Sequence, residues 1–163
     1  MELIDYKQAN TIKLYEMYQD IPKKEWDFTN KLLNVNYEEF LKEYNNILNE
    51  EYDEVYPTKK YVLEDKGVYI GYIGLRLSKD KQYIKGASQL FYQIRVSQRK
   101  KRYSYELVKL GLLEMKKYGF DIVGINCNEL NIPSKKAIEK NNGLFIKKYK
   151  SNTGISNMYK VKL

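Results

Sequence analysis

The chain has 163 residues, of which 29 are Lys or Arg and 21 are Asp or Glu, so its formal net charge at pH 7 is +8. It contains no histidine and one cysteine, Cys127. This composition excludes a Ser–His or Cys–His catalytic pair, a cysteine zinc cluster and an internal disulfide, and we expect no metal cofactor. A hydrophobic fraction of 43% and a charged fraction of 31% are typical of a globular protein. With no linker in the sequence, we expect one domain over residues 1–163.

No apolar stretch approaches the ~18 residues that a membrane-spanning helix needs. The N-terminus, Met1 to Asp5, lacks the basic and apolar segments of a signal peptide. Together with the lone thiol, this predicts a cytoplasmic protein without a membrane partner. The positive net charge favours an anionic partner, for which nucleic acid and a phosphorylated cofactor are both candidates. A lysine-rich composition of the whole genome would give the same charge without any partner.

The first half of the chain is expected to form strands and two helices. Apolar residues recur at helical spacing before Pro22 and again after Asn36, whereas β-branched and aromatic residues dominate the stretch around the turn Lys66-Gly67. In chain order these patterns predict a strand at 1–7, helices at 10–18 and 37–50, and strands at 59–65 and 68–77.

The second half changes period after a polar connection at 78–86. A strand at 88–96 is followed by an amphipathic helix, and the apolar run Phe120 to Asn126 is typical of a buried strand. Pro133 opens another helix, where proline is tolerated. The predicted elements are a strand at 88–96, a helix at 104–118, a strand at 120–126, a helix at 133–140, and strands near 144–149 and 156–162. The order is that of a mixed α/β fold.

The joint between the strand 88–96 and the next helix is strongly basic. Five basic residues fall within eight positions just before the N-terminus of the helix: Arg95, Arg99, Lys100, Lys101 and Arg102. A helix N-terminus offers unpaired N–H groups and a partial positive charge, which suit a phosphate group. A solvated basic turn is the alternative interpretation of the same residues.

A second polar cluster, Asn126 to Ser134, follows the predicted strand 120–126. Asn131 or Ser134 can cap the helix that begins near Pro133, which is a purely structural role. Binding of a ligand next to this helix is the functional alternative. On spacing alone we favour the structural role.

Combined, the two clusters resemble the GNAT acetyltransferase superfamily, and the resemblance extends from about Tyr61 to Lys147. It is closest to small bacterial predicted acetyltransferases. Family members carry a strand ending in an Ile-Arg-Pro-Ser-like segment, then an Arg/Gln-x-x-Gly-x-Gly/Ala loop, then a long helix; Ile94 to Ser97 and Arg99 to Ser104 stand in these places. The later family motif is matched by Cys127, Asn131, Ser134, Ile138, Glu139, Lys140, Asn141 and Gly143.

The resemblance implies a mostly antiparallel mixed sheet whose two central parallel strands, here 88–96 and 120–126, splay apart around acetyl-CoA. It implies a cofactor-binding core over about 61–147. It also implies that main-chain groups of Ile94 and Val96 hold the acetyl carbonyl and the pantetheine arm. The implied contacts of the pyrophosphate are the amides of Arg99, Lys100, Lys101, Arg102, Tyr103 and Ser104, and those of the pantetheine or adenine side are Asn131 and Ser134.

Three positions depart from the family pattern. Arg102 occupies the first glycine position of the loop, where glycine permits a positive φ or a close approach to phosphate. Gln89 stands where many members have a glutamate base, and Ile138 where many have a tyrosine acid. The usual acid and base are therefore both absent. Tyr92 is a nearby phenol that could replace the acid, although packing is the simpler role for any one of 17 tyrosines.

The predicted function is an N-acetyltransferase that uses acetyl-CoA on an unidentified amine of a small molecule or peptide. Acidic residues of the N-terminal half, such as Asp20, Glu25 and the run Glu50 to Glu54, could receive a cationic amine or form a solvated face. The alternative is a GNAT-like binding or regulatory module without catalysis. A nucleic-acid binder is less favoured, because the sequence has no base-reading motif. A homodimer is common for the implied fold.

Overall fold

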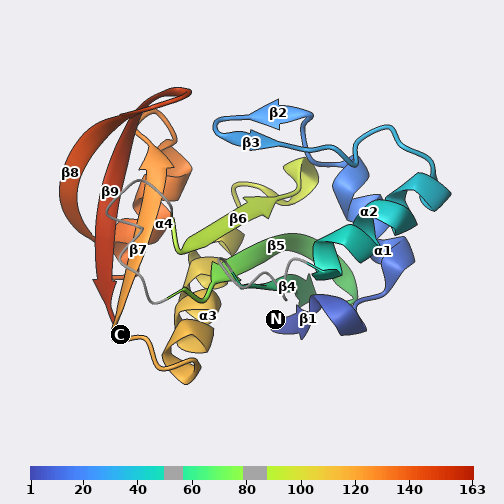
Figure 1. Cartoon of the computed structure of the whole chain (residues 1–163), viewed down its shortest axis with the longest axis horizontal. Coiled ribbons are helices and arrows are strands. Elements are labelled where there is room, and N and C mark those ends of the chain that lie inside the picture. Colours follow the sequence, from blue (N-terminus) through green and yellow to red (C-terminus); the bar gives the residue numbers. More distant parts are fainter. Residues whose placement is uncertain (50–56, 79–87) are drawn as a thin grey trace.

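The computed structural model in Figure 1 describes residues 1–49, 57–78 and 88–163. The mixed α/β order is confirmed. The elements are β1 (Glu2–Asp5), α1 (Thr11–Gln19), β2 (Lys24–Glu25), β3 (Phe28–Thr29), α2 (Tyr37–Asn49), β4 (Thr58–Asp65), β5 (Val68–Arg76), β6 (Leu90–Ile94), α3 (Tyr103–Lys117), β7 (Ile122–Asn128), α4 (Ile132–Lys140), β8 (Leu144–Ser151) and β9 (Gly154–Lys162). The hairpin β2–β3 was not predicted. The acidic run at 50–54 and most of the predicted connection 78–86 lie outside the described residues.

The strands form two larger sheets that meet at the N-terminal end of β6. One sheet has the order β1-β4-β5-β6 and the other β7-β9-β8, and every pairing inside them is antiparallel. At the joint, the N–H of Gln89 donates to the Gly124 carbonyl (2.9 Å) and the Gly124 N–H donates to Gln89 Oε1 (2.8 Å). Beyond this joint β6 and β7 separate (Figure 1), as the resemblance implies for the two central strands.

Strand β6 ends at Ile94 rather than at the predicted Val96. Residues 96–98 form a short 3₁₀ turn instead, and Arg99 then returns to an extended conformation. Strand β7 likewise begins at Ile122, two residues later than predicted, and runs to Asn128. The earlier end of β6 lengthens the connection to α3, whereas β7 extends two residues beyond its predicted end at Asn126.

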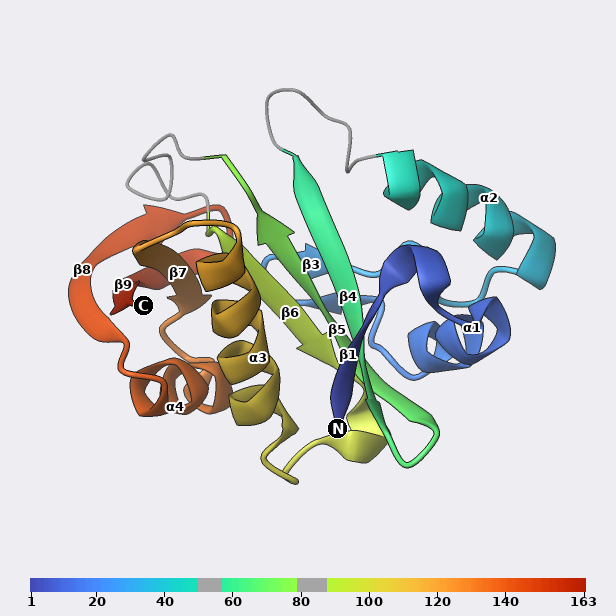
Figure 2. The ribbon, with the colours of Figure 1, turned by 90° about the horizontal axis from the view of Figure 1, so that it is seen from below.

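Helices cover both faces of the sheet β1-β4-β5-β6 (Figure 2): α1 and α2 lie on one face, and α3 lies on the other. The side chains alternate accordingly. Val62 belongs to the same buried cluster as Phe40 of α2 and Leu14 of α1, whereas Leu63 belongs to the same cluster as Leu107 of α3. All five side chains are fully buried. The two apolar clusters hold the sheet between its helices and determine where α3 begins.

Helix α3 approaches the sheet closely at Gly111. A Cβ atom at this position would lie 2.3 Å from Ile73 Cδ1 and 3.1 Å from Leu90 Cδ1. Because glycine lacks this atom, the helix can rest directly on β5 and β6. Its N-terminus is thereby held next to the C-terminal end of β6, where the candidate site lies.

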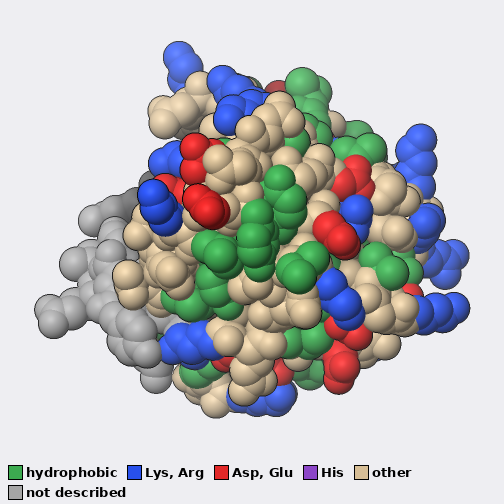
Figure 3. All heavy atoms as spheres, turned by 90° about the vertical axis from the view of Figure 1, so that its right-hand side faces the viewer, with side chains coloured by type: hydrophobic (Ala, Val, Ile, Leu, Met, Phe, Trp, Pro, Cys, Tyr) green, Lys and Arg blue, Asp and Glu red, His purple; other side chains and the backbone are tan. Residues whose placement is uncertain are grey.

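The side of the molecule that carries α1 and α2 shows acidic and basic side chains interspersed around a central hydrophobic cluster (Figure 3). The acidic residues Glu38 and Glu39 occupy the first turn of α2, where their negative charge interacts favourably with the helix dipole. No helix in the described ranges is both long and apolar enough to span a membrane. The same ranges contain no cluster of His, Cys, Asp or Glu suited to a metal ion.

Candidate active site

A cavity of about 480 Å³ lies at the C-terminal end of β6, between the beginning of α3 and α4. Its walls come from four places: the end of β6, the loop and first turn of α3, the exposed side of α4, and the tip of the β2–β3 hairpin. Ile94 contributes from β6, Tyr103 from α3, Ser134 from α4 and Trp26 from the hairpin. Segments that are far apart in the sequence therefore meet at one cavity.

The loop before α3 adopts the left-handed conformation at two positions. Arg102, the residue that precedes the helix, has φ 66° and ψ 5°, and Lys100 has φ 64°. This conformation costs a non-glycine residue roughly 1 kcal/mol or more. Arg102 therefore takes the conformation that the family's glycine permits, and it does so with a charged side chain.

The N-terminus of α3 is open toward the cavity. Arg102 makes no side-chain capping bond, and the N–H groups of Tyr103 and Ser104, as the first two helical residues, have no acceptor within the helix. Both residues line the cavity. The 15-residue helix adds the positive end of its dipole, so this end of the cavity attracts an anion.

Charged side chains around the cavity are mostly basic. Lys100, Arg102, Lys136 and Lys140 line it, whereas Glu25 is the one acidic residue among the described lining residues. That glutamate is already paired, because Arg99 donates to its two carboxylate oxygens, each over 2.7 Å. The cavity therefore carries a surplus of positive charge.

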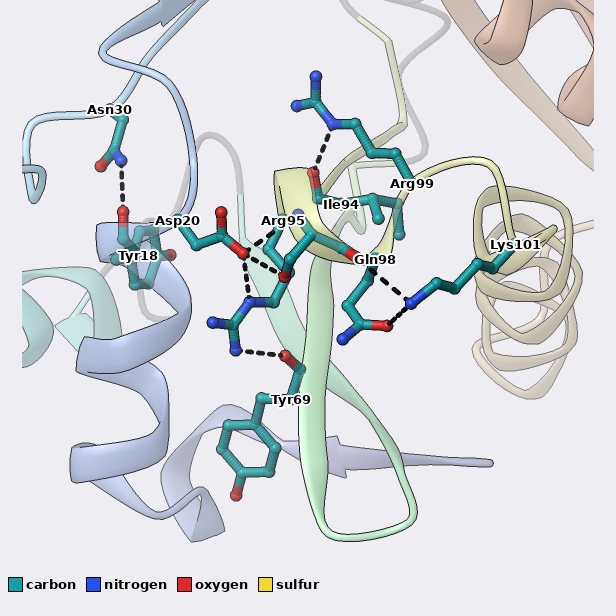
Figure 4. A network of polar contacts seen from close by, with 10 residues as sticks. Tyr18, Asp20, Asn30, Tyr69, Ile94, Arg95, Gln98, Arg99 and Lys101 are labelled. Carbon is teal, nitrogen blue, oxygen red and sulfur yellow. Dashed lines mark hydrogen bonds and ion pairs between the residues drawn. The ribbon is translucent and has the colours of Figure 1, made fainter.

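Arg99 connects the loop to the hairpin rather than pointing a free guanidinium at a ligand. Besides the two bonds to Glu25, its Nε donates to the main-chain carbonyl of Ile94 over 3.0 Å (Figure 4). A bidentate Arg–carboxylate pair is geometrically specific. It therefore fixes the tip of the β2–β3 hairpin, with Trp26, against the end of β6.

Arg95 is also occupied within the protein. Its Nε donates to Asp20 Oδ2 over 2.7 Å, and Ser97 donates to the same oxygen (Figure 4). Burial by itself would raise the pKa of Asp20, but the hydrogen bonds from Ser97 and Arg95 outweigh it and lower that pKa. Asp20 and Glu25 therefore each hold an arginine within the protein, rather than forming the fully solvated face that was one of the two alternatives.

The main-chain groups of Val96, which the resemblance assigns to the cofactor, are already bonded within the protein. The Val96 N–H donates to the Asp20 carbonyl over 2.8 Å, and its own carbonyl accepts from the Arg99 N–H. Neither main-chain group is left for a ligand, and the exposed Val96 side chain does not line the cavity. The cause is the 3₁₀ turn at 96–98, which bends the chain toward α1 at the point where the sequence predicts continued strand.

Replacing Asp20 by Asn tests this network. We expect the D20N variant to lose about 1 kcal/mol of unfolding free energy at neutral pH, because charge-assisted hydrogen bonds become neutral ones. The lowered pKa means that the wild-type carboxylate stabilises the fold above its ordinary pKa of 3.8, and that this stabilisation disappears as the pH falls through the folded-state value. Urea unfolding from pH 7 to pH 2.5 should show the difference shrinking. The exposed Asp121→Asn is the control, and a difference that persists unchanged at low pH would contradict this assignment.

Tyr92 and Ser134 form a polar pair at the floor of the cavity. Their hydroxyl oxygens are 2.9 Å apart, and both residues line the cavity. Burial raises the pKa of Tyr92 to about 12, although the hydrogen bond with Ser134 opposes the shift. Cys127 lies nearby, and burial likewise raises the pKa of its thiol to about 11. At neutral pH this floor therefore offers protonated donors and no thiolate.

Comparison with known proteins adds the fold. No family model and no curated protein sequence matches the chain. Solved structures do match. A RimL ribosomal L7/L12 α-N-protein acetyltransferase in complex with coenzyme A has TM-score 0.72 and 16% identity over 99% of this chain and 92% of that one. A ribosomal-protein-alanine N-acetyltransferase from Brucella melitensis has TM-score 0.72 and 14% identity over 100% of both chains. This protein has the GNAT acetyltransferase fold. A spermidine N-acetyltransferase variant from Vibrio cholerae shares it, with TM-score 0.63 and 12% identity over 99% of this chain and 93% of that one.

Within this GNAT fold, nine of the eleven residues predicted for the site lie on one cavity, while Val96 and Lys101 do not. Lys101 turns away and donates to the Ser97 carbonyl and to Gln98 Oε1 (Figure 4). Asn131 does cap α4, since its side chain accepts from the Ser134 N–H over 3.2 Å. The predicted residues that line the cavity are Tyr92, Ile94, Arg99, Lys100, Arg102, Tyr103, Ser104, Asn131 and Ser134.

The two departures in the family's acid and base positions have structural explanations. Gln89 is buried in the joint between the sheets, where its side chain bonds Gly124, so it does not line the cavity. Ile138 is fully buried in the core and packs beneath Gly143. A tyrosine at 138 would therefore enter the core rather than the cavity, which differs from the role that the resemblance gives this position.

Two features of the wall were not predicted. The first is the hairpin that carries Glu25 and Trp26, whose two-residue strands are too short to produce a periodic pattern. The second is the pair of Lys136 and Lys140, which lie four positions apart in α4 and therefore share one helix face. Their spacing was visible in the sequence, but whether that face met the cavity depended on how α4 packs against α3.

Proposed function

We propose that this protein is an acetyl-CoA-dependent N-acetyltransferase that acts on a primary amine. One observation carries the proposal: the open N-terminus of α3, a surplus of cations and the Tyr92–Ser134 pair all face one cavity at the end of β6. A cationic wall suits an anionic acyl thioester such as acetyl-CoA, and a buried hydroxyl pair can supply a proton to a departing thiolate. The GNAT fold supports the same conclusion.

The cavity suits acetyl-CoA in the chemistry of its walls. Acetyl-CoA supplies an activated acetyl thioester. The N–H groups of Tyr103 and Ser104, with the side chain of Arg102, would hold its pyrophosphate through charge-assisted bonds at the helix N-terminus. Ile94, at the end of β6, would lie along the pantetheine arm. Asn131 and Ser134 would face it from α4. Of the predicted contacts, these assignments keep those of Arg102, Tyr103, Ser104, Asn131 and Ser134, and they place Ile94 beside the pantetheine arm without using its carbonyl, which accepts from Arg99 Nε.

The proposed reaction is a direct attack of the amine nitrogen on the thioester carbonyl carbon. The C–S bond would then break, the departing sulfur would take a proton, and the nitrogen would release one proton to solvent as the amide forms, from which the proton donor is restored. Tyr92 would give the sulfur its proton, because its raised pKa keeps the phenol protonated at working pH. No unpaired carboxylate lines the cavity in the described ranges, so the acceptor amine would enter already neutral. Positioning then supplies much of the rate.

We expect Tyr92→Phe to lower kcat by about 100-fold, since general acid catalysis typically contributes at least that much. The Kd for acetyl-CoA should change less than threefold, because the phenol ring and the phosphate contacts remain. Steady-state kinetics and calorimetry separate the two quantities. Tyr118→Phe is a matched control, since it removes a tyrosine hydroxyl that bonds Tyr61 at 3.0 Å, outside the cavity. Equal kcat in Tyr92→Phe and wild type would remove Tyr92 from the mechanism.

The acceptor is proposed at the level of an amine-bearing small molecule or peptide. Structures with the same fold are named for both kinds, a ribosomal protein in one case and spermidine in another. Trp26 lines the cavity beside Glu25 and is 37% exposed, so it offers an aromatic surface to an incoming acceptor. The paired state of Glu25 favours an acceptor that does not depend on this carboxylate for binding.

The alternative is a GNAT-like module that binds a ligand without catalysis, and the lack of an unpaired carboxylate in the described cavity wall favours it. Calorimetric titration with acetyl-CoA and CoA tests the proposal first. Binding near micromolar Kd, followed by release of free thiol in the presence of an amine panel, supports the enzyme. Binding without turnover of any amine supports the module. No binding at about 1 mM would overturn the enzyme and leave the module, with a ligand other than CoA.

A further inference from the structure

Two lysines of α4 form a cationic group separate from the loop before α3. Lys136 and Lys140 are four positions apart, so they lie one above the other on the same side of the helix. Both line the cavity and both are exposed. Neither ammonium group has an ion-pair or hydrogen-bond partner within the described ranges. Two unpaired cations on the wall of one cavity, with no carboxylate opposite them except the paired Glu25, call for an anionic ligand group.

The packing of α4 places these lysines beside the phosphate end of the cavity. Asn141, the residue that follows Lys140, donates through Nδ2 to the Tyr105 carbonyl in the first turn of α3, over 3.1 Å. It also donates to the Ala137 carbonyl over 2.8 Å, which fixes the side chain. The end of α4 is thereby tied to the beginning of α3. Lys140 lies next to this tie, and Lys136 lies one helical turn back toward the cavity floor.

Two anion-binding groups then face the same cavity. The first consists of the N–H groups at the start of α3 with Lys100 and Arg102, and it suits a diphosphate. The second is the lysine pair, which the diphosphate does not need. Acetyl-CoA carries a further phosphate, the monoester on the 3′ position of its ribose, with about −1.5 to −2 charge at pH 7.

We infer that Lys136 and Lys140 bind the 3′-phosphate of acetyl-CoA and make the protein selective for CoA over its 3′-dephospho form. The inference rests on the proposed function. It gives a role to two residues that are not part of the phosphate-binding loop before α3. Lysine is suited to it, because a flexible point charge can follow a monoester phosphate at the rim of a cavity without the rigid geometry that arginine imposes.

The experiment measures Kd for CoA and for 3′-dephospho-CoA by calorimetry, on the full chain. We expect wild-type protein to bind CoA at least tenfold more tightly. In the double variant Lys136→Gln/Lys140→Gln, CoA affinity should fall about tenfold, while dephospho-CoA affinity stays within twofold. Glutamine keeps the helix propensity and removes the charge. Thermal unfolding of the unliganded variant verifies that it is folded.

Lys135→Gln is the matched control, because it removes one charge from the same helix at a position that does not line the cavity. It should keep the wild-type ratio of the two Kd values. Equal binding of both ligands by wild-type protein, or an unchanged ratio in the double variant, would overturn this inference and leave the proposed cofactor intact. Failure of wild-type protein to bind either ligand would overturn the proposed function itself.

Discussion

Charge reversal at Arg102 should weaken acetyl-CoA binding by at least 100-fold, or about 2.7 kcal/mol. Arg102 precedes α3 in the left-handed conformation and lines the cavity. Glutamate at this position would remove a charge-assisted bond and place a carboxylate against the pyrophosphate. Calorimetry on Arg102→Glu measures the change. Since Arg102 is exposed and makes no capping bond, the fold should retain its stability within about 0.5 kcal/mol.

Arg102→Gly is the informative partner of this variant. Glycine adopts φ 66° without a steric penalty, so the loop should become more stable by up to about 1 kcal/mol. Its acetyl-CoA affinity should fall about tenfold, because the cation is lost but no repulsion is added. The order wild type, Gly, Glu would identify charge as the cause. Unchanged affinity in Arg102→Glu would show that the pyrophosphate does not bind at this loop.

Among Gly→Ala substitutions near the site, Gly71→Ala should lower the free energy of unfolding most. A Cβ at Gly71 would lie 2.2 Å from the main-chain oxygen of Gln93 and 3.0 Å from Ile94 Cδ1. The main-chain oxygen of Gln93 cannot move by a change of rotamer, as a side-chain atom can. The added Cβ therefore forces β5 and β6 to separate locally. We expect a loss of about 3 kcal/mol of unfolding free energy, at the upper end of overpacking costs. Cofactor affinity should fall with it, because Gln93 and Ile94 both line the cavity.

Gly74→Ala in the same strand is the matched control. Its Cβ would come within 2.1 Å of Phe91 Cζ, the far end of a half-buried side chain that can swing away by a change in its χ1 angle. The cost should stay near 1 kcal/mol, and cofactor affinity should remain at the wild-type value. Chemical denaturation and calorimetry on both variants provide the comparison. Equal destabilisation by the two substitutions would show that β6 adjusts as easily as a ring does.

Much of the fold follows from periodicity. The β-branched and aromatic residues of β4 and β5 give way to helical spacing in α3, because both faces of these strands are buried in apolar clusters whereas α3 buries one face. The hairpin β2–β3 escaped prediction because its strands have two residues each. The end of β6 was misplaced because Val96 favours strand, whereas the bond of its N–H to the Asp20 carbonyl draws the chain toward α1. That partner lies 76 positions away in the sequence, beyond the reach of any local pattern.

The sequence predicted the parts of the site that main-chain N–H groups form. Tyr103 and Ser104 sit at a helix N-terminus, and a basic run before a helix is visible in the sequence. Side-chain pairing was not visible. Arg95 and Arg99 look like free cations in the sequence, yet both hold carboxylates of the N-terminal half. Conversely, Lys136 and Lys140 carry charge into the cavity from a helix that the motif describes through Asn131 and Ser134.

The joint at Gln89 and Gly124 has a mechanical consequence. At this end of the molecule two sheets are held by a few main-chain and side-chain bonds, and beyond it they part. Any ligand that contacts both β6 and α4 adds a second set of non-covalent contacts across the opening. Its free energy of binding is then added to the stability of the whole domain, by about 2.7 kcal/mol at a hundredfold excess over Kd. The melting temperature of this protein should therefore serve as a gauge of ligand concentration, even for ligands that undergo no reaction.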